Sequence, residues 1–132
     1  MNATRVLLDT QVVLWALQNP RRLYGRRSLL EDPMVTRLLS AAVVWEVAIK
    51  AGLGRLDLAM PVGDWARRAA TDLVAERLPI TDEHAAGVAD LPPHHRDPFD
   101  RLLIAQARAL AVPLVSADAA LAAYDVEVLT VG

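Results

Sequence analysis

Short apolar runs alternate with amphipathic segments along most of this chain. The apolar run at residues 6–8 ends at Asp9, and the segment from Thr10 onward has the spacing of apolar positions that is typical of a helix. The same pattern predicts strands at residues 6–8, 35–39, 77–80, 112–115 and 126–130, and helices at 10–18, 29–32, 41–53, 62–73, 82–91 and 98–110, with a helical turn at 117–123. Strands that alternate with helices favour parallel pairing, with helices on both faces of the sheet. The expected fold class is therefore α/β, a three-layer α/β/α sandwich around a short parallel sheet.

Polar residues at the starts of the predicted helices support these boundaries. Ser40 and Thr81 are expected to cap the helices that follow them. Asp97 precedes a proline at the first helical position, which is a strong helix start. Residues 20–33 are rich in arginine and show no clear pattern, although Ser28 is a candidate cap for a short helix there. The run at 77–80 contains Pro79, which indicates an edge strand.

Length and composition restrict the class of protein. A chain of 132 residues is expected to form one domain spanning residues 1–132. It has no cysteine, which excludes disulfides and thiolate metal sites. No apolar run approaches the roughly 20 residues that cross a bilayer, and the first residues lead directly into a strand, so we expect no signal peptide and a cytoplasmic location. The net charge of −2 argues against a strong overall attraction to nucleic acid.

Acidic residues recur near the ends of the predicted strands. Asp9 and Asp118 follow the first and fourth strands, whose carboxyl ends lie at one edge of a parallel sheet. Glu46 lies in the helix after the second strand, and Asp100 in the first turn of the helix before the fourth. Like charges packed together destabilise one another, and a cation relieves that repulsion. Oxygen ligands without cysteine favour Mg²⁺ or Mn²⁺, and such a site suits phosphoryl chemistry.

Each of these acids also has a simpler interpretation. Glu46 and Lys50 are four residues apart, in the order that forms an ordinary helix-surface ion pair, but apolar residues flank Glu46 on both sides. Capping explains Asp97 fully, whereas Asp100 in the same turn gains only from the helix dipole. Asp118 has the position of a cap for the turn that follows it. Spacing alone therefore leaves the metal site as one hypothesis among others.

Histidine and tryptophan side chains have structural interpretations by default. An exposed loop accounts for the histidines better than metal binding does, although the segment HHRD has the look of a weak metal cluster; they are His84, His94 and His95. Core packing or a subunit contact is the default for the tryptophans, with base stacking as the alternative; they are Trp15, Trp45 and Trp65. Ser40 and Ser116 have no evident base beside them and are interpreted as caps or supporting hydroxyls, not as nucleophiles.

Four segments in order along the chain carry a family resemblance: LLDTQVVLWAL, LSAAVVWEVAIKAGLGRL, DPFDRLLIAQA and LVSADAALAAYDVEVL. Together they resemble PIN-domain proteins of the VapC toxin type over nearly the whole chain. The resemblance implies an α/β/α fold around a parallel sheet and an endoribonuclease that depends on Mg²⁺ or Mn²⁺. It also implies a toxin restrained by a cognate VapB antitoxin, and a toxin homodimer.

The resemblance assigns roles to individual acids. The acids of LLDT, WE, PFDR and SAD are Asp9, Glu46, Asp100 and Asp118. Asp9, Asp100 and Asp118 are expected to hold the metal, while Glu46 either ligates it or orients the attacking water. Asp97 matches a further acid of this subgroup and is the second choice as a ligand.

Two departures from the family pattern affect the surroundings of these acids. Gln11 stands where many members have histidine or alanine, and Val43 and Val44 stand where many have a serine before WE. Neither departure removes an acidic ligand, although the second removes a polar neighbour of Glu46. The expectation is therefore a change in rate, not in reaction.

Arginines near the expected cleft are candidates for holding RNA phosphates: Arg101, Arg21 and Arg22. Three other functions stay open on the residues alone. A phosphatase with Asp9 as nucleophile would need an acid at the position of Gln11. A phospho-accepting receiver domain would need a late lysine, and the chain has only Lys50. A catalytically weak PIN-like binding module would have no reason to keep four acids that repel one another.

Overall fold

The computed structural model describes residues 4–132, except for the side chain of Tyr24. Its elements, in chain order, are β1 (Thr4–Leu8), α1 (Thr10–Gln18), the 3₁₀ helix η1 (Pro20–Arg26), α2 (Arg27–Glu31), β2 (Val35–Ser40), α3 (Ala41–Gly52), α4 (Val62–Asp72), β3 (Ala75–Leu78), α5 (Asp82–Gly87), the 3₁₀ helix η2 (Val88–Asp90), α6 (Pro98–Leu110), β4 (Leu114–Ser116), the 3₁₀ helix η3 (Ala119–Ala123) and β5 (Val128–Thr130).

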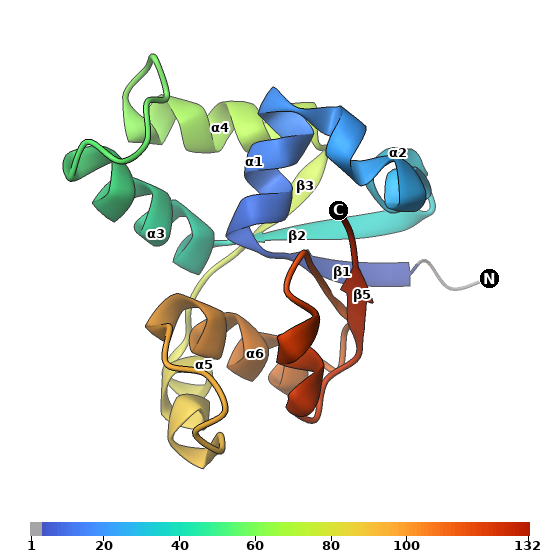
Figure 1. The fold of residues 1–132 in the computed structure, drawn as a ribbon, viewed down its shortest axis with the longest axis vertical. Coiled ribbons are helices and arrows are strands. Elements are labelled where there is room, and N and C mark those ends of the chain that lie inside the picture. Colours follow the sequence, from blue (N-terminus) through green and yellow to red (C-terminus); the bar gives the residue numbers. More distant parts are fainter. Residues whose placement is uncertain (1–3) are drawn as a thin grey trace.

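All five strands form one parallel sheet in the order β3-β2-β1-β4-β5. Figure 1 shows α1, α2 and α4 on one side of the sheet and α5 and α6 on the other, while α3 extends from the end of β2. The predicted α/β/α sandwich is therefore confirmed. The chain builds outward from β1 to β3 and then crosses to the other side of β1 to form β4. The border between β1 and β4 is thus the point where the winding reverses, which is where open α/β sheets bind ligands.

The position of β1 at the centre of the sheet explains why its sequence is a continuous apolar run. Val6, Leu7 and Leu8 are completely buried, because helices cover both faces of the sheet at β1. From the other side, Leu103 and Ile104 of α6 pack into the same core. This core fixes the carboxyl end of β1, and with it the residue that follows the strand.

The observed strands differ from the predicted ones in their boundaries: β1 begins two residues earlier, at Thr4, and β2 ends one residue later, at Ser40. β3 spans Ala75–Leu78 and not 77–80, because its register is set by pairing with β2, from Arg37 opposite Ala75 to Ser40 opposite Leu78. Two of its four residues are exposed, so no apolar run marks it in the sequence. Likewise β4 and β5 begin two residues later than predicted.

The helices follow the sequence more closely, with two exceptions. Residues 20–26 form η1, and α2 then begins at Arg27, so Ser28 lies inside the helix and does not cap it. The helix expected at 82–91 is divided into α5 and η2. The predicted caps are confirmed: the Ser40 hydroxyl accepts from the backbone N–H of Ala42, and the Thr81 hydroxyl from that of His84. Within residues 4–132 every helix is too short or too polar to cross a membrane.

Candidate functional site

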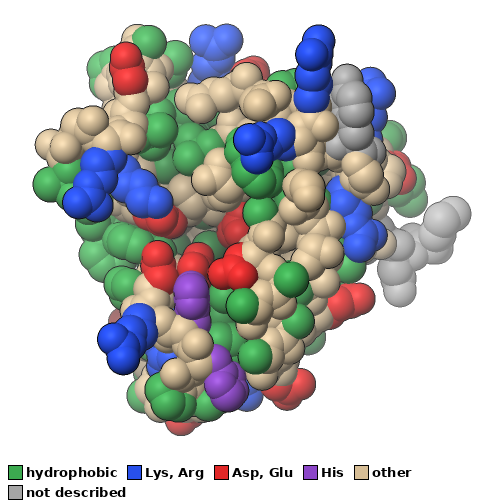
Figure 2. Space-filling model, in the orientation of Figure 1, with side chains coloured by type: hydrophobic (Ala, Val, Ile, Leu, Met, Phe, Trp, Pro, Cys, Tyr) green, Lys and Arg blue, Asp and Glu red, His purple; other side chains and the backbone are tan. Residues whose placement is uncertain are grey.

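A polar pocket of about 410 Å³ lies at the carboxyl ends of β1 and β4. It is lined by Asp9, Thr10, Gln11, Leu14, Glu46, Lys50, Asp97, Asp100, Ala117 and Asp118. All five acids predicted from the sequence therefore line one hollow, although they come from four separate segments of the chain. Figure 2 shows a group of acidic side chains gathered in a hollow near the middle of this face, with a histidine beside them.

Asp9 occupies the turn between β1 and α1. Its carboxylate caps α1, accepting a hydrogen bond from the backbone N–H of Val12 at 2.9 Å. The residue is only 6% exposed, and this burial raises the pKa of its carboxyl group to about 6. Hydrogen bonds from the Ser116 side chain and from Val12 oppose the shift, whereas the charges of Asp100 and Glu46 add to it. Asp9 is thus a buried acid that carries its negative charge at a free-energy cost.

Glu46 lies on α3 and is held through both of its carboxylate oxygens. Oε1 accepts a hydrogen bond from the Thr10 hydroxyl at 2.5 Å, and Oε2 pairs with the Lys50 ammonium at 2.7 Å. The surface ion pair considered for Glu46 and Lys50 is therefore present, but it lies in the pocket, and Glu46 is buried. Thr10 is a supporting residue that the sequence suggested only through its place beside Asp9.

Asp100 and Asp118, which line the pocket, also face a histidine. The His95 Nε2 atom lies 2.7 Å from Oδ2 of Asp100 and 4.0 Å from Oδ2 of Asp118. Burial raises the pKa of the Asp100 carboxyl group, and the charges of Asp97 and Glu46 raise it further, while the hydrogen bond with His95 lowers it. The ligand atoms of His95, Asp100 and Asp118 all lie within 4.8 Å of one another. They form a compact group of donor atoms that includes two of the acids lining the pocket.

Two of these acids also cap helices, as the simpler interpretations predicted. The Asp97 carboxylate accepts from the backbone N–H groups of Phe99 and Asp100, and the Asp118 carboxylate accepts from that of Ala120. Capping employs Oδ1 in both residues, while Oδ2 of Asp118 faces His95. For Asp118, capping and a role in the pocket are therefore compatible.

Arg101 has a structural role in place of the phosphate contact considered for it. Its guanidinium donates hydrogen bonds to the carbonyl oxygens of Pro92, His95, Val88 and Leu91, and to the Tyr124 hydroxyl. These acceptors engage both terminal nitrogens, so we remove Arg101 from the candidate RNA contacts. Sequence patterns do not indicate this role, because four of the five acceptors are backbone carbonyls.

Comparison with known proteins identifies the family. The PIN domain family model matches residues 6–127. The chain belongs to the PIN domain family. Over 106 residues it is 36% identical to Ribonuclease VapC22 of Mycobacterium tuberculosis, a match that covers 79% of each chain. The resemblance to VapC-type proteins is thereby confirmed.

Solved structures support the fold of this PIN domain at low sequence identity. VapBC2 from Rickettsia felis, bound to a DNA fragment from its promoter, superposes with a TM-score of 0.71 at 13% identity, covering 98% of this chain and 100% of that one. DNA-bound VapBC from Salmonella typhimurium superposes with a TM-score of 0.71 at 15% identity, covering 96% of this chain and 98% of that one. FitAcB from Neisseria gonorrhoeae superposes with a TM-score of 0.64 at 23% identity, covering 95% of this chain and 96% of that one.

A second groove, of about 510 Å³, adjoins the acidic pocket of the PIN domain. It is lined by Arg21, Arg22, Gly25, Arg26, Ala117, Ala119, Thr130, Val131 and Gly132, so that Ala117 lines both hollows. The Arg22 guanidinium lies 4.9 Å from the ring centre of Trp15, a cation–π contact. Arg21 and Arg22 are exposed, so they present positive charge at the rim of the acidic site.

The remaining histidines and tryptophans depart in part from their default interpretations. His84 is buried, and its Nδ1 atom lies 3.2 Å from Nε2 of Gln106, so it does not belong to an exposed loop. Trp65 is buried as predicted, but Trp45 is 52% exposed and contacts the edge of Phe99. Trp45 is therefore not a core residue.

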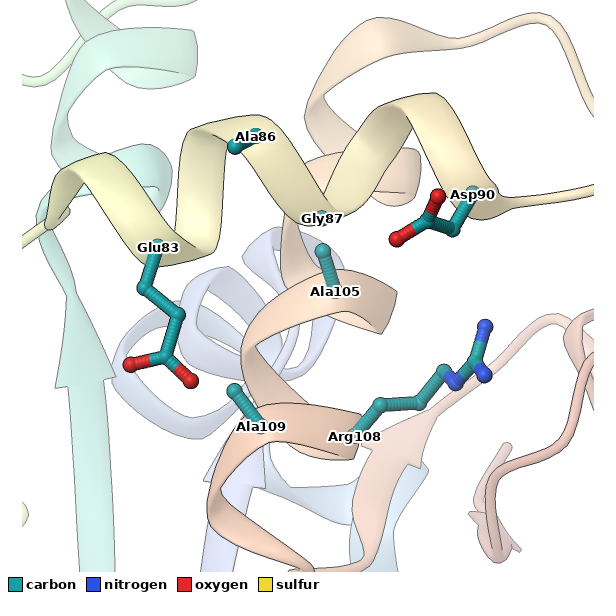
Figure 3. Close-up of a pocket in the computed structure, with 7 residues that line it drawn as sticks. All are labelled: Glu83, Ala86, Gly87, Asp90, Ala105, Arg108 and Ala109. Atoms are coloured by element: carbon teal, nitrogen blue, oxygen red, sulfur yellow. The ribbon is translucent and has the colours of Figure 1, made fainter.

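The acidic pocket is one of several concave surfaces on the PIN domain. Another, of about 440 Å³, lies between α5, η2 and α6 and is drawn in Figure 3; its lining residues are Glu83, Ala86, Gly87, Asp90, Ala105, Arg108 and Ala109. There Gly87 faces Ala105, and a Cβ on Gly87 would lie 3.7 Å from that of Ala105. None of the acids predicted for the site lines this surface, so it is a region of close helix packing away from the candidate chemistry.

Proposed function

We propose that this protein is a metal-dependent endoribonuclease and the toxin of a toxin–antitoxin pair, hydrolysing RNA phosphodiester bonds. The observation that carries the proposal is the single pocket in which Asp9, Glu46, Asp97, Asp100 and Asp118 meet at the carboxyl edge of a PIN-domain sheet. The 36% identity to Ribonuclease VapC22 supports the choice of RNA as substrate.

The residues of the pocket fit a divalent cation such as Mg²⁺ or Mn²⁺. Their donors are mostly carboxylate oxygens, and burial together with mutual repulsion raises the pKa values of Asp9 and Asp100. A bound cation would relieve that repulsion. We assign the ligand role to Asp9, Asp100 and Asp118, with Asp97 as the second choice. When bound, the ion would supply a Lewis acid for the phosphate oxygens and for the attacking water.

Glu46 is suited to orienting the attacking water. Its two oxygens are fixed by Thr10 and Lys50, so the carboxylate keeps one position at the wall of the pocket. A fixed carboxylate can accept a hydrogen bond from a water molecule and take up its proton as the bond to phosphorus forms. Of the two roles open to Glu46, we therefore choose this one over direct ligation.

Arg21 and Arg22 are the proposed phosphate contacts. They line the groove that shares Ala117 with the acidic pocket, so a strand of RNA crossing the pocket would pass over them. Because the net charge is only −2, binding should depend on the shape of the RNA more than on overall charge.

The proposed partners are a VapB-type antitoxin and a second copy of the toxin. The solved VapBC structures from Rickettsia felis and Salmonella typhimurium have the same fold. A further neighbour, VapBC-5 from Mycobacterium tuberculosis, is named as a member of the VapBC family of toxin–antitoxin systems. We place the protein in the cytoplasm, where RNA and such an antitoxin occur. A phosphatase is the weaker alternative, because Gln11 lines the pocket where a nucleophilic Asp9 would need a general acid.

Cleavage of total RNA, mapped with and without EDTA, tests the proposal. Wild type should cut RNA in Mg²⁺ or Mn²⁺ and lose activity in EDTA, and Asp9→Asn should lose at least about 100-fold in rate. Asp90→Asn is the matched control, because this aspartate lines the separate hollow between α5 and α6. Cutting by Asp9→Asn at the wild-type rate would exclude the assignment, and turnover of phosphate monoesters without RNA cleavage would favour the phosphatase.

A further inference from the structure

His95 lies beside two of the acids that line the pocket, and it has the chemistry of a metal ligand. Its Nε2 atom is 2.7 Å from Oδ2 of Asp100 and 4.0 Å from Oδ2 of Asp118. Metal–ligand bonds of about 2.1 Å place adjacent ligand atoms of an octahedral ion about 3 Å apart and opposite ones about 4.2 Å apart. The observed separations are therefore close to those of atoms that share one ion.

The backbone of His95 is held on both sides by hydrogen bonds. Its N–H donates to the Tyr124 hydroxyl at 2.8 Å, and its carbonyl accepts from the Arg101 guanidinium at 3.3 Å. Arg101 also donates to the Tyr124 hydroxyl at 3.2 Å, so the three residues form a closed triangle. We call Arg101 and Tyr124 the loop clamp.

The loop clamp is attached to the same elements as the acids. Arg101 follows Asp100 directly on α6, while Asp118 and Tyr124 are the residues before and after η3. Any shift of α6 or η3 therefore moves His95 together with the carboxylates that it faces. This coupling is what a ligand set drawn from three segments needs, because its donor atoms must keep their spacing.

The neighbouring His94 shows that a position next to His95 in the sequence does not by itself bring a ring nitrogen to the acids. His94 is exposed, and its ring contacts the edge of the Tyr124 ring, with centroids 5.2 Å apart. His94 is not part of the group of donor atoms that His95 forms with Asp100 and Asp118. Of the two adjacent histidines, it is His95 that brings a ring nitrogen next to these carboxylates.

We propose that His95 supplies a nitrogen ligand to the cation held by Asp100 and Asp118, and that the loop clamp positions it there. The inference rests on the proposed function to the extent that the pocket binds a divalent cation. Imidazole nitrogen suits transition-metal ions, whereas Mg²⁺ keeps to oxygen ligands and water. The site should therefore prefer Mn²⁺ to Mg²⁺, and His95 is the residue that sets the preference.

Electron paramagnetic resonance of Mn²⁺ added to the purified full chain tests this assignment directly. The wild-type complex should show the ¹⁴N coupling of a coordinated imidazole, and His95→Gln should lose it. The Mn²⁺ dissociation constant should rise about tenfold in His95→Gln, while that for Mg²⁺, measured by competition, should change much less. His94→Gln is the matched control and should keep both the coupling and the affinity.

Tyr124→Phe tests the loop clamp without touching the imidazole. It removes the hydroxyl that binds His95 and Arg101 but keeps the buried ring. We expect a smaller loss of Mn²⁺ affinity, about threefold, with the ¹⁴N coupling retained in the bound state. Unchanged affinity would contradict the positioning role of the clamp.

Three results would overturn the proposal: no ¹⁴N coupling in wild type, a coupling that persists in His95→Gln, or equal weakening of Mn²⁺ and Mg²⁺ in that variant. The wild-type spectrum decides even if His95→Gln does not fold. Mn²⁺ binding without nitrogen coupling, together with RNA cleavage, would refute this inference and leave the proposed function intact. Absence of both cation binding and RNA cleavage would refute the proposed function and this inference with it.

Discussion

Replacing Asp9 with asparagine should stabilise the metal-free protein at neutral pH. The pKa of the Asp9 carboxyl group is about 6 in the folded protein, compared with 3.8 for an aspartate outside the fold. This difference corresponds to a free-energy cost of about 3 kcal/mol for the ionised carboxylate in the folded state. Because the folded pKa is the higher one, the folded state binds this proton more tightly than the unfolded state. The contribution of Asp9 to stability is therefore most favourable below pH 3.8, is lost as the pH rises to about 6, and stays lost above that value.

Asparagine keeps the shape of the side chain and the oxygen that caps α1 through Val12, but it carries no charge. Compared with wild type in EDTA, Asp9→Asn should gain up to about 3 kcal/mol at pH 7.5 and less than about 1 kcal/mol at pH 4. For a chain of this length the larger gain raises Tm by roughly 10 °C.

Urea unfolding at the two pH values, with a thermal melt beside it, measures the effect. Asp90→Asn, outside the pocket, should show no gain that depends on pH. Adding Mn²⁺ should then raise the Tm of wild type, by mass action on the folded state, and raise that of Asp9→Asn much less. An equal gain at pH 4 and pH 7.5, or no gain at either, would refute the reasoning, because the penalty would then not come from an ionised, buried carboxylate.

Three further substitutions test contacts around the site and the core. Lys50→Met removes the half-exposed ammonium that pairs with Glu46. In EDTA, the free energy of unfolding should fall by about 1 kcal/mol, and added Mn²⁺ should raise Tm more than it does in wild type. An Mn²⁺-induced rise in Tm equal to that of wild type would argue against compensation of the Glu46 charge by Lys50. Ser40→Ala removes a fully buried hydroxyl that caps α3 and donates a hydrogen bond to Gln106 at 2.6 Å. Urea unfolding should show a decrease of about 2–3 kcal/mol in the free energy of unfolding. A decrease below about 0.5 kcal/mol would contradict this prediction. Arg37→Met removes the buried guanidinium that donates hydrogen bonds to three backbone carbonyls. Thermal and urea unfolding should show a decrease of about 3 kcal/mol in the free energy of unfolding. Unchanged stability would contradict this prediction.

The sequence predicts those parts of the fold in which burial leaves a continuous pattern. Val6, Leu7 and Leu8 are apolar because helices cover both faces of β1, and Ser40 is recognisable because a helix start needs an acceptor there. β3 lacks such a pattern: it is an edge strand with exposed Glu76 and Arg77, and only its pairing with β2 fixes where it starts. Local sequence does not contain that information.

Two kinds of information predict the acids of the candidate site from the sequence. Asp9 and Asp118 follow from the topology of a parallel sheet, and Glu46 and Asp100 from family resemblance. The sequence predicts an exposed loop position for His95, because a loop has no periodicity that shows where a side chain points. Its position beside Asp100 depends on Arg101, whose guanidinium binds backbone carbonyls, and such contacts leave no trace in the sequence.

The ion-pair and hydrogen-bond partners around the pocket explain why Asp9 is the acid that a bound cation would affect most. Glu46 is paired with Lys50, and Asp100 with His95. Among the side chains described here, no basic group lies within ion-pair distance of Asp9, whose carboxylate has only the Ser116 side chain and the Val12 N–H as hydrogen-bond donors. Lys50 thus offsets part of the charge on Glu46, and a hydrogen bond with His95 stabilises the Asp100 carboxylate, whereas the charge on Asp9 is uncompensated in a buried position. A divalent ion in this pocket would therefore stabilise the protein most through Asp9, which is why that position separates the effect of charge from the effect of shape most clearly.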